Sequence, residues 1–243
     1  MYITRLDQIT PSSTEIYVNA CQESFVGFQF PEKLQTLTLD NYRQSLIGVE
    51  FPESLKELEL INYQQCLIGV KFPETLQKLY LNIYPLSLVG VIFPKTLQKL
   101  SIHWYSTCLR GVKFPELLEE LHLAGHSSSL AEVQFPKTLS KLYLFYHSLN
   151  LAEVQFPEML QELDLDIRSL CLIGVKFPET LQKLYLWNGS ISSIGVQFPH
   201  ELTIIINNRL IINPKFEFIK NEHGINHYTY LKYPRDHFIK PCL

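Results

Sequence analysis

Asp164 and Asp166 have the spacing of paired catalytic carboxylates. They alternate with leucines, so on an extended strand both side chains would lie on one face, about 7 Å apart. Carboxylates at such a separation can act as a general acid and a general base. An open sheet surface offers no pocket that would exclude water or shift their pKa values, so this pair alone does not predict an enzyme.

Two pairs of histidines have the spacing of metal ligands: His122 with His126, and His223 with His227. Neither pair has a companion set of Cys, Asp or Glu at a recognised ligand distance. The sequence also lacks phosphate loops, dinucleotide-binding glycine patterns and the G-x-S-x-G motif. It therefore predicts no catalytic residue, no metal site and no cofactor, and a protein that is not an enzyme.

The segments that would position these residues repeat every 21 residues. A Phe-Pro pair marks each repeat, and no insertion interrupts the prolines at Pro31, Pro52, Pro73, Pro94, Pro115, Pro136, Pro157, Pro178 and Pro199. Columns of leucine, glycine and valine keep the same spacing, which gives the unit F-P-x-x-L-x-x-L-x-L-x6-L-x-G-V-x. Repeats of about this length are typical of solenoids, in which each unit forms one coil.

The L-x-L step in each unit predicts a strand with one buried face. Phe-Pro holds the return side extended, because proline fixes its own φ and restricts the residue before it. The expected fold is therefore a mostly β solenoid of leucine-rich-like repeats, with one parallel strand per coil and an extended or 3₁₀ convex side. At about 4.8 Å per rung, the coils would form a rod roughly 45 Å long.

The L-x-x-L-x-L step resembles leucine-rich repeats, and the whole unit resembles FNIP repeats more specifically. Residues 62–73, Asn-Tyr-Gln-Gln-Cys-Leu-Ile-Gly-Val-Lys-Phe-Pro, carry the aromatic residue, leucine, glycine and proline of that family, although no asparagine follows the tyrosine. The similarity covers about residues 20–206. FNIP repeats are common in amoebae and giant viruses, and the resemblance implies a protein-interaction module.

The ends of the chain depart from the regular unit, as solenoid caps do. We expect residues 1–29 to form an N-terminal cap with a degenerate first coil and residues 30–198 to form eight regular repeats. Residues 199–243 should form a partial coil and a C-terminal cap. Asn207 falls where the period places a buried leucine, so regularity ends there.

Strand residues that flank the buried leucines should face outward on the sheet side, the surface with which solenoids of this kind usually bind partners. The predicted binding residues on this face are Tyr80, His103, His122, Tyr143, Phe145, Asp164, Asp166, Tyr185 and Trp187. Exposed aromatic residues grouped with charges resemble interface hot spots. The competing interpretation is that aromatic residues simply fit strand surfaces.

Three other columns have structural interpretations. The tyrosine column, which ends in His126, His147 and Arg168, should form a buried aromatic spine rather than a second binding stripe. A column of small polar residues should bond the backbones of successive coils. The glycine column indicates a tight turn, but Glu132 and Glu153 occupy it in two coils, so either glycine is not required or those coils are rearranged.

Composition argues against several classes of partner. A formal charge of −3, from 21 basic and 24 acidic residues, is unlike that of nucleic-acid-binding proteins. The sequence has no apolar run long enough to span a bilayer and does not begin with a signal-peptide pattern. Five cysteines without a pair at disulfide distance fit a reducing compartment. We therefore expect an intracellular protein without nucleic-acid or membrane partners.

These features favour a protein–protein interaction scaffold that uses its exposed strand face, with a partner and an oligomeric state that the sequence does not identify. A structural or self-assembling rod is the alternative. A carbohydrate binder or an unrecognised enzyme that uses Asp166, Tyr185 and Trp187 is a third hypothesis.

Overall fold

The computed structural model of the chain describes residues 2–105, 109–125, 129–145, 150–166, 169–187, 190–192, 196–206, 209–211, 217–220 and 226–229. The strands are β1 (Tyr2–Ile3), β2 (Glu15–Asn19), β3 (Thr36–Asp40), β4 (Glu57–Ile61), β5 (Lys78–Asn82), β6 (Lys99–Tyr105), β7 (Glu120–Gly125), β8 (Lys141–Phe145), β9 (Glu162–Asp166), β10 (Ser169–Cys171), β11 (Lys183–Trp187), β12 (Ser190–Ser192), β13 (Thr203–Ile206), β14 (Arg209–Ile211), β15 (Glu217–Lys220) and β16 (Asn226–Thr229). A short 3₁₀ helix, η1 (Leu6–Gln8), follows β1.

One sheet runs the length of the solenoid, in the order β1-β2-β3-β4-β5-β6-β7-β8-β9-β11-β13-β14. Every pairing from β1 to β13 is parallel, as predicted. In the regular coils, residues 21 positions apart in the sequence lie opposite each other on neighbouring strands. Leu58 of β4, for example, lies opposite Leu37 of β3 and Leu79 of β5. Two smaller sheets pair β10 with β12 in parallel and β15 with β16 in antiparallel fashion.

The core follows from the L-x-L step. In β4, Leu58 and Leu60 are fully buried, whereas Glu57, Glu59 and Ile61 alternate with them and remain partly exposed. The same alternation recurs in β5, β8, β9 and β11. The leucines of successive coils form one continuous core, which no coil could build alone.

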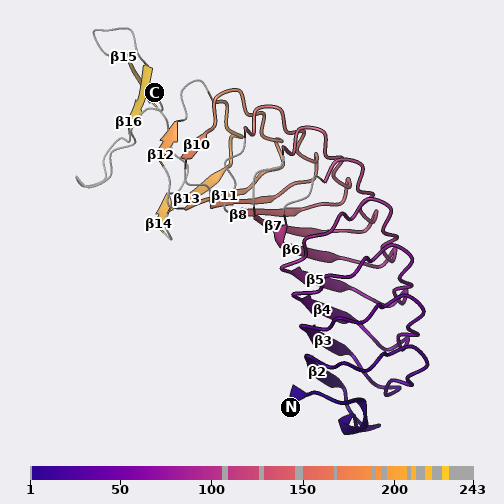
Figure 1. Cartoon of the computed structure of the whole chain (residues 1–243). Helices are drawn as coiled ribbons and strands as arrows, with labels where there is room; N and C mark the ends of the chain where they lie inside the picture. The colour runs from indigo at the N-terminus through magenta and orange to yellow at the C-terminus, as the bar shows by residue number, and fades with distance from the viewer. Residues whose placement is uncertain are drawn as a thin grey trace.

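The solenoid is an arch with the sheet on its inner side (Figure 1). On the outer side, phenylalanines of neighbouring Phe-Pro pairs stack with ring centroids 6.0 Å apart at Phe30–Phe51 and 6.1 Å apart at Phe156–Phe177. Strands of a sheet lie only about 4.8 Å apart. The coils fan out on the side away from the sheet, as Figure 1 shows. The rod expected from the repeat count is therefore curved, and its inner surface is called the concave face below.

The glycine column closes a hydrogen-bonded turn in the return segment. The Leu46 carbonyl accepts a hydrogen bond from the Val49 amide at 3.2 Å, and Gly48 between them has a φ of +82°. Such a turn favours glycine because a side chain strains this conformation. At Glu132 and Glu153 the corresponding hydrogen bonds remain, yet neither glutamate has a positive φ. Those two coils keep the turn with a different backbone geometry, so glycine is not required in every coil.

The small polar column caps these turns within its own coil. Ser45 Oγ accepts a hydrogen bond from the Ile47 amide at 3.1 Å, and Cys66 Sγ accepts one from the Ile68 amide at 3.4 Å. The same contact with the amide two residues later is made by Ser24, Ser87, Ser129 and Asn150. The expectation that this column bonds successive coils is wrong for these residues, because a short side chain reaches its own turn first.

The last parallel coil is one residue shorter than the regular 21-residue coils. Leu186 of β11 lies opposite Ile206 of β13, and Leu184 lies opposite Ile204, each twenty residues on. The 21-residue period predicts that Asn207 lies opposite Leu186. This prediction is wrong, because the shorter coil places Ile206 there. After β13 the chain reverses, and β14 pairs with β13 in antiparallel fashion.

Candidate interaction surface

The concave face carries three columns of side chains, since alternate residues of each strand point away from the core. The first column contains Glu57, Lys78, Lys99, Glu120, Lys141, Glu162 and Lys183. The second contains Thr38, Glu59, Tyr80, Ser101, His122, Tyr143, Asp164 and Tyr185, and the third contains Asp40, Ile61, Asn82, His103, Ala124, Phe145, Asp166 and Trp187. All nine predicted binding residues lie in the second and third columns, and all nine are partly exposed.

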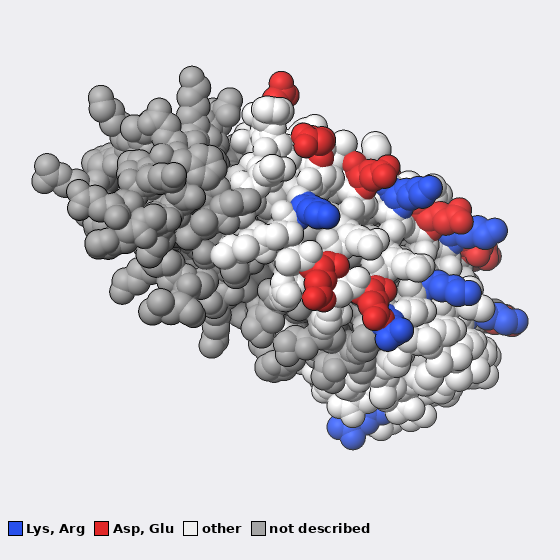
Figure 2. All heavy atoms as spheres, turned by 90° about the horizontal axis from the view of Figure 1, so that it is seen from above, with Lys and Arg blue, Asp and Glu red and all other residues white. Residues whose placement is uncertain are grey.

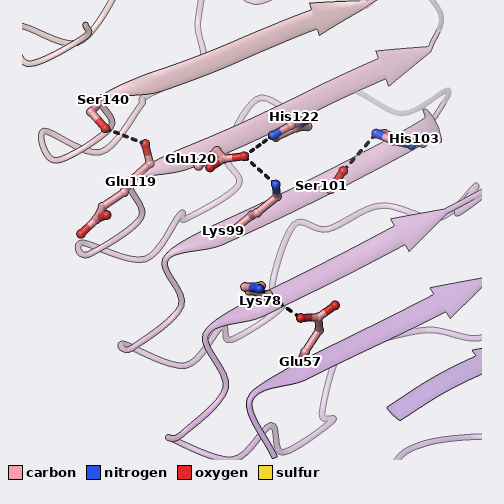
Figure 3. Close-up of polar contacts among 9 residues, drawn as sticks. All are labelled: Glu57, Lys78, Lys99, Ser101, His103, Glu119, Glu120, His122 and Ser140. Atoms are coloured by element: carbon pink, nitrogen blue, oxygen red, sulfur yellow. Dashed lines mark hydrogen bonds and ion pairs between the residues drawn. The ribbon is translucent and has the colours of Figure 1, made fainter. Parts of the chain in front are cut away.

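The first column, which sequence reasoning missed, consists of charges that pair between coils. Lys78 Nζ lies 3.2 Å from a Glu57 carboxylate oxygen, as Figure 3 shows, and Lys183 Nζ lies 2.8 Å from one of Glu162. The signal was visible as a Lys or Glu immediately before the apolar alternating step in seven successive coils, from Glu57 to Lys183. Solvent screens such exposed pairs, so they order the rim of the face more than they stabilise it.

A polar cluster occupies the middle of the concave face, on β6 and β7 (Figure 3). One carboxylate oxygen of Glu120 lies 2.6 Å from Lys99 Nζ and 2.5 Å from His122 Nε2. In the same cluster, Ser101 Oγ lies 3.0 Å from His103 Nε2. Burial, together with Lys99, lowers the pKa of His103. Burial also lowers the pKa of His122, although the hydrogen bond to Glu120 opposes the shift. Both imidazoles are therefore neutral at pH 7.

An aromatic run leads from this cluster toward the C-terminal coils. The rings of His122 and Tyr143 stack with centroids 4.0 Å apart, and Phe145 lies 6.3 Å from Tyr143. In the other direction, Lys99 Nζ lies 5.7 Å from the centroid of the Tyr80 ring. Together with the polar cluster, these contacts bring five of the predicted binding residues into one part of the concave face: Tyr80, His103, His122, Tyr143 and Phe145.

Two aspartates lie between aromatic rings beyond this run. Asp164 of β9 lies opposite Tyr143 of β8 and Tyr185 of β11. Burial raises the pKa of Asp164 to about 6; Trp187 opposes this shift and Asp166 adds to it. The sheet surface does shift the pKa of one carboxyl here, contrary to the expectation for an open face, because the flanking rings exclude solvent.

Replacing Asp164 with asparagine is expected to stabilise the protein at pH 8 by about 1 kcal/mol, since the folded state then no longer buries a charge. Solvent still reaches the side chain and screens part of the burial effect. The folded-state pKa is raised to about 6, so folding takes up a proton between about pH 4 and pH 6 and wild-type stability falls as pH rises through that range. Urea denaturation at several pH values measures the difference. It should shrink to nothing below about pH 4, and a difference independent of pH would contradict the assigned pKa.

Acidic side chains at the N-terminal end of the concave face are satisfied internally. Asp40 accepts hydrogen bonds from Tyr17 Oη at 2.7 Å, Asn41 Nδ2 at 2.8 Å and Asn19 Nδ2 at 3.2 Å. Glu59 likewise accepts one from Asn82 at 2.7 Å. The carboxylates at this end of the face therefore have side-chain donors, in contrast to Asp164, although Asn82 Oδ1 itself is buried without a partner.

The tyrosine column is a buried spine, as predicted, at Tyr42, Tyr63 and Tyr84, all of which are fully buried. The Tyr63 hydroxyl accepts a hydrogen bond from the Leu46 amide at 3.0 Å and donates one to the Gln44 carbonyl at 3.3 Å, so it ties each coil to the one before. The later members of the column, His126, His147 and Arg168, lie outside the described residues.

The histidine pairs cannot be assembled into a metal site from the described residues. His126 and His223 lie outside them, and within them there is no group of three potential Cys, His, Asp or Glu ligands. The described part of the chain also has no helix long and apolar enough to cross a membrane. Acidic and basic side chains are interspersed on the face that Figure 2 shows, and neither sign forms a large patch among the coloured atoms.

Residues 42–84, which span two coils from one spine tyrosine to another, match the family model of the FNIP repeat. These two coils are FNIP repeats. Asn41 and Asn62, which precede the spine tyrosines Tyr42 and Tyr63, have φ values of +52°, a conformation that asparagine tolerates better than most residues. Asn62 Nδ2 donates to Asn41 Oδ1 at 2.6 Å, so these two asparagines also link neighbouring coils.

The solenoid has the fold of leucine-rich repeat proteins. It is similar to CroV588, described as a novel circular LRR protein, with a TM-score of 0.67 and 19% identity over 80% of this chain and 30% of that chain. A looser similarity to YopM from Yersinia enterocolitica WA-314 has a TM-score of 0.41 and 17% identity, over 79% of this chain and 48% of that one. This chain spans less than half the length of either protein. No curated protein matches the sequence.

Proposed function

We propose that this FNIP-repeat protein is an interaction scaffold that binds a partner protein on its concave face, chiefly on β8, β9 and β11. One observation carries the proposal: buried columns repeat the same residue types, whereas successive coils never carry the same residue in the second or the third concave column. A surface whose residues vary between coils, and which carries aromatic and charged side chains, is suited to the recognition of one partner. In this proposal the protein acts inside the cell without catalysis, nucleic acid or a membrane.

A structural, self-assembling role is the second candidate, and an apolar stripe on the return side favours it. Val26, Ile47, Ile68 and Val89 occupy the same turn position in four successive coils, and each is about half exposed. Stacking end to end through the sheet has less support, because the antiparallel β14 ends the parallel order at one end. Self-association would therefore have to use the side of the arch.

The test compares two matched double variants, each of which replaces two half-exposed or partly exposed residues by serine. Tyr143→Ser with Tyr185→Ser alters the concave face, and Ile47→Ser with Ile68→Ser alters the stripe. Proteins captured by wild-type and variant protein from a eukaryotic lysate are compared by quantitative mass spectrometry. A set of proteins should be lost with the concave variant and retained by the stripe variant. Identical capture by all three would contradict the proposal, and concentration-dependent elongation of wild type in light scattering, abolished in the stripe variant, would favour assembly.

A further inference from the structure

Six residues of the concave face form a two-column pattern of rings and carboxylates, which we call the ring–carboxylate patch: Tyr143, Phe145, Asp164, Asp166, Tyr185 and Trp187. In the second column Asp164 lies between Tyr143 and Tyr185. In the third column Asp166 lies between Phe145 and Trp187 in the same register. Each carboxylate therefore has an aromatic neighbour on the strand on either side, about 4.8 Å away along the sheet.

Polar atoms in this patch are buried without partners. Asp164 Oδ1 and Trp187 Nε1 have no hydrogen bond among the described residues. The indole N–H lies close enough to lower the pKa of Asp164, but the two groups do not reach hydrogen-bond geometry. A carboxylate oxygen that is buried without a donor is costly, and proteins normally supply one. The contrast with Asp40, which accepts three side-chain hydrogen bonds, makes Asp164 an acceptor that lacks its donor.

Described basic side chains next to the patch do not supply this donor. Lys183 is paired with Glu162, and Lys99 is paired with Glu120 in the central cluster. Lys141 of β8 lies opposite Glu162 and not opposite either aspartate. Among the described residues no ion pair reaches Asp164 or Asp166. Within the described part of the chain, the two carboxyl groups therefore have no cationic partner.

A cationic side chain matches both features of the patch. Arginine and lysine donate charge-assisted hydrogen bonds to carboxylates, and their cations also lie favourably over the faces of tyrosine and tryptophan. We infer that the ring–carboxylate patch is the specificity site of the concave face and takes an arginine or lysine side chain from a partner protein. The inference rests on the proposed function and adds the chemistry of the contact.

Burial of the patch strengthens this match. Because the flanking rings raise the pKa of Asp164 to about 6, a bound cation that favours the carboxylate should lower this pKa. Binding should accordingly weaken below about pH 6, as protonation of Asp164 removes the charge. A carbohydrate, whose hydroxyls need rings and acceptors but no net charge, would show neither effect.

The test selects peptides from a random phage-displayed library on wild-type protein, with counter-selection on the Asp164→Asn, Asp166→Asn variant. This variant should fold at least as well as wild type, since it removes a buried charge, and circular dichroism checks that it does. Enriched peptides should contain arginine or lysine, and replacing that residue by its neutral counterpart (citrulline for arginine) should weaken binding about tenfold. The matched control is Glu59→Gln, a carboxylate of the same column whose oxygen accepts a hydrogen bond from Asn82, and it should leave binding unchanged.

The remaining outcomes overturn the inference in distinguishable ways. Peptides without basic residues that bind wild type and the double asparagine variant equally, but not the Tyr143→Ser, Tyr185→Ser variant, would leave the concave face as a binding surface and refute its preference for cations. Failure to enrich any peptide over the double asparagine variant would refute the cation site as well. A glycan array giving a hit that the asparagine variant retains would replace the peptide partner by a carbohydrate.

Discussion

Replacing Leu121 with alanine should lower the free energy of unfolding by about 2–5 kcal/mol. Leu121 is fully buried in β7, in register with Leu100 of β6 and Leu142 of β8. The truncation leaves a cavity between coils that are held in place by neighbours on both sides, so the site has little freedom to collapse. Because solenoid stability depends on nearest-neighbour contacts, a defect in a middle coil weakens two interfaces at once. Urea denaturation measures the loss, and the slope of the unfolding free energy against urea concentration should be the same for the variant and the wild type.

Tyr143→Ala is the comparison for this prediction, because Tyr143 belongs to the next strand but points to the concave face. It is partly exposed, and its main contacts are the rings of His122 and Phe145. Its loss should cost about 1 kcal/mol, the order of an aromatic pair contact. Equal losses at Leu121 and Tyr143 would contradict the assignment of the two faces.

Replacing Tyr63 with phenylalanine should cost about 2 kcal/mol, although the ring and its packing remain. The lost hydroxyl accepts the Leu46 amide hydrogen bond and donates to the Gln44 carbonyl. Burial raises the pKa of Tyr63, so the hydroxyl is neutral in the folded state and acts as both donor and acceptor. Without it, a buried amide and a carbonyl of the preceding coil lose their partner, and each such loss carries a desolvation cost. Thermal and urea unfolding of the variant measure the effect.

Tyr84→Phe is the matched control, one coil further along the same spine. Tyr84 is as completely buried as Tyr63, but its hydroxyl makes no hydrogen bond of standard geometry within the described part of the chain. The Leu67 amide lies close enough only to oppose the rise that burial causes in the pKa of Tyr84. The second substitution should therefore cost much less than the first. Similar losses at the two positions would show that the tyrosine hydroxyls do not tie the coils together and that only their rings matter.

The local pattern of the sequence was sufficient for the architecture. Strict spacing of Phe-Pro and of the L-x-L step predicts a stack of parallel strands, because an alternating apolar strand must bury one face and an isolated coil has nothing to bury it against. The same alternation places Tyr143 and Tyr185 on the opposite face from the leucines, and the structure has them there. The column to which a residue belongs follows from its position in the repeat, and the repeat can be recognised from the sequence alone.

Contacts between coils were decided only by the tertiary structure. The charged first column is formed by residues 21 positions apart whose pairing depends on side-chain reach, and the turn at Glu132 keeps its hydrogen bond without glycine. The shorter last coil shifts the register by one residue, so Ile206 rather than Asn207 pairs with Leu186. A repeat pattern does not reveal such choices because they depend on distances between coils.

The state of Asp164 was likewise decided by the tertiary structure. The strand register places Asp164 between Tyr143 and Tyr185, and burial of its carboxyl there raises its pKa to about 6. The sequence by itself determined which residues share a column, because membership of a column follows from the repeat spacing. How closely the side chains of a column approach one another depends on distances between coils, so only the tertiary structure decided which polar atoms remain without a partner.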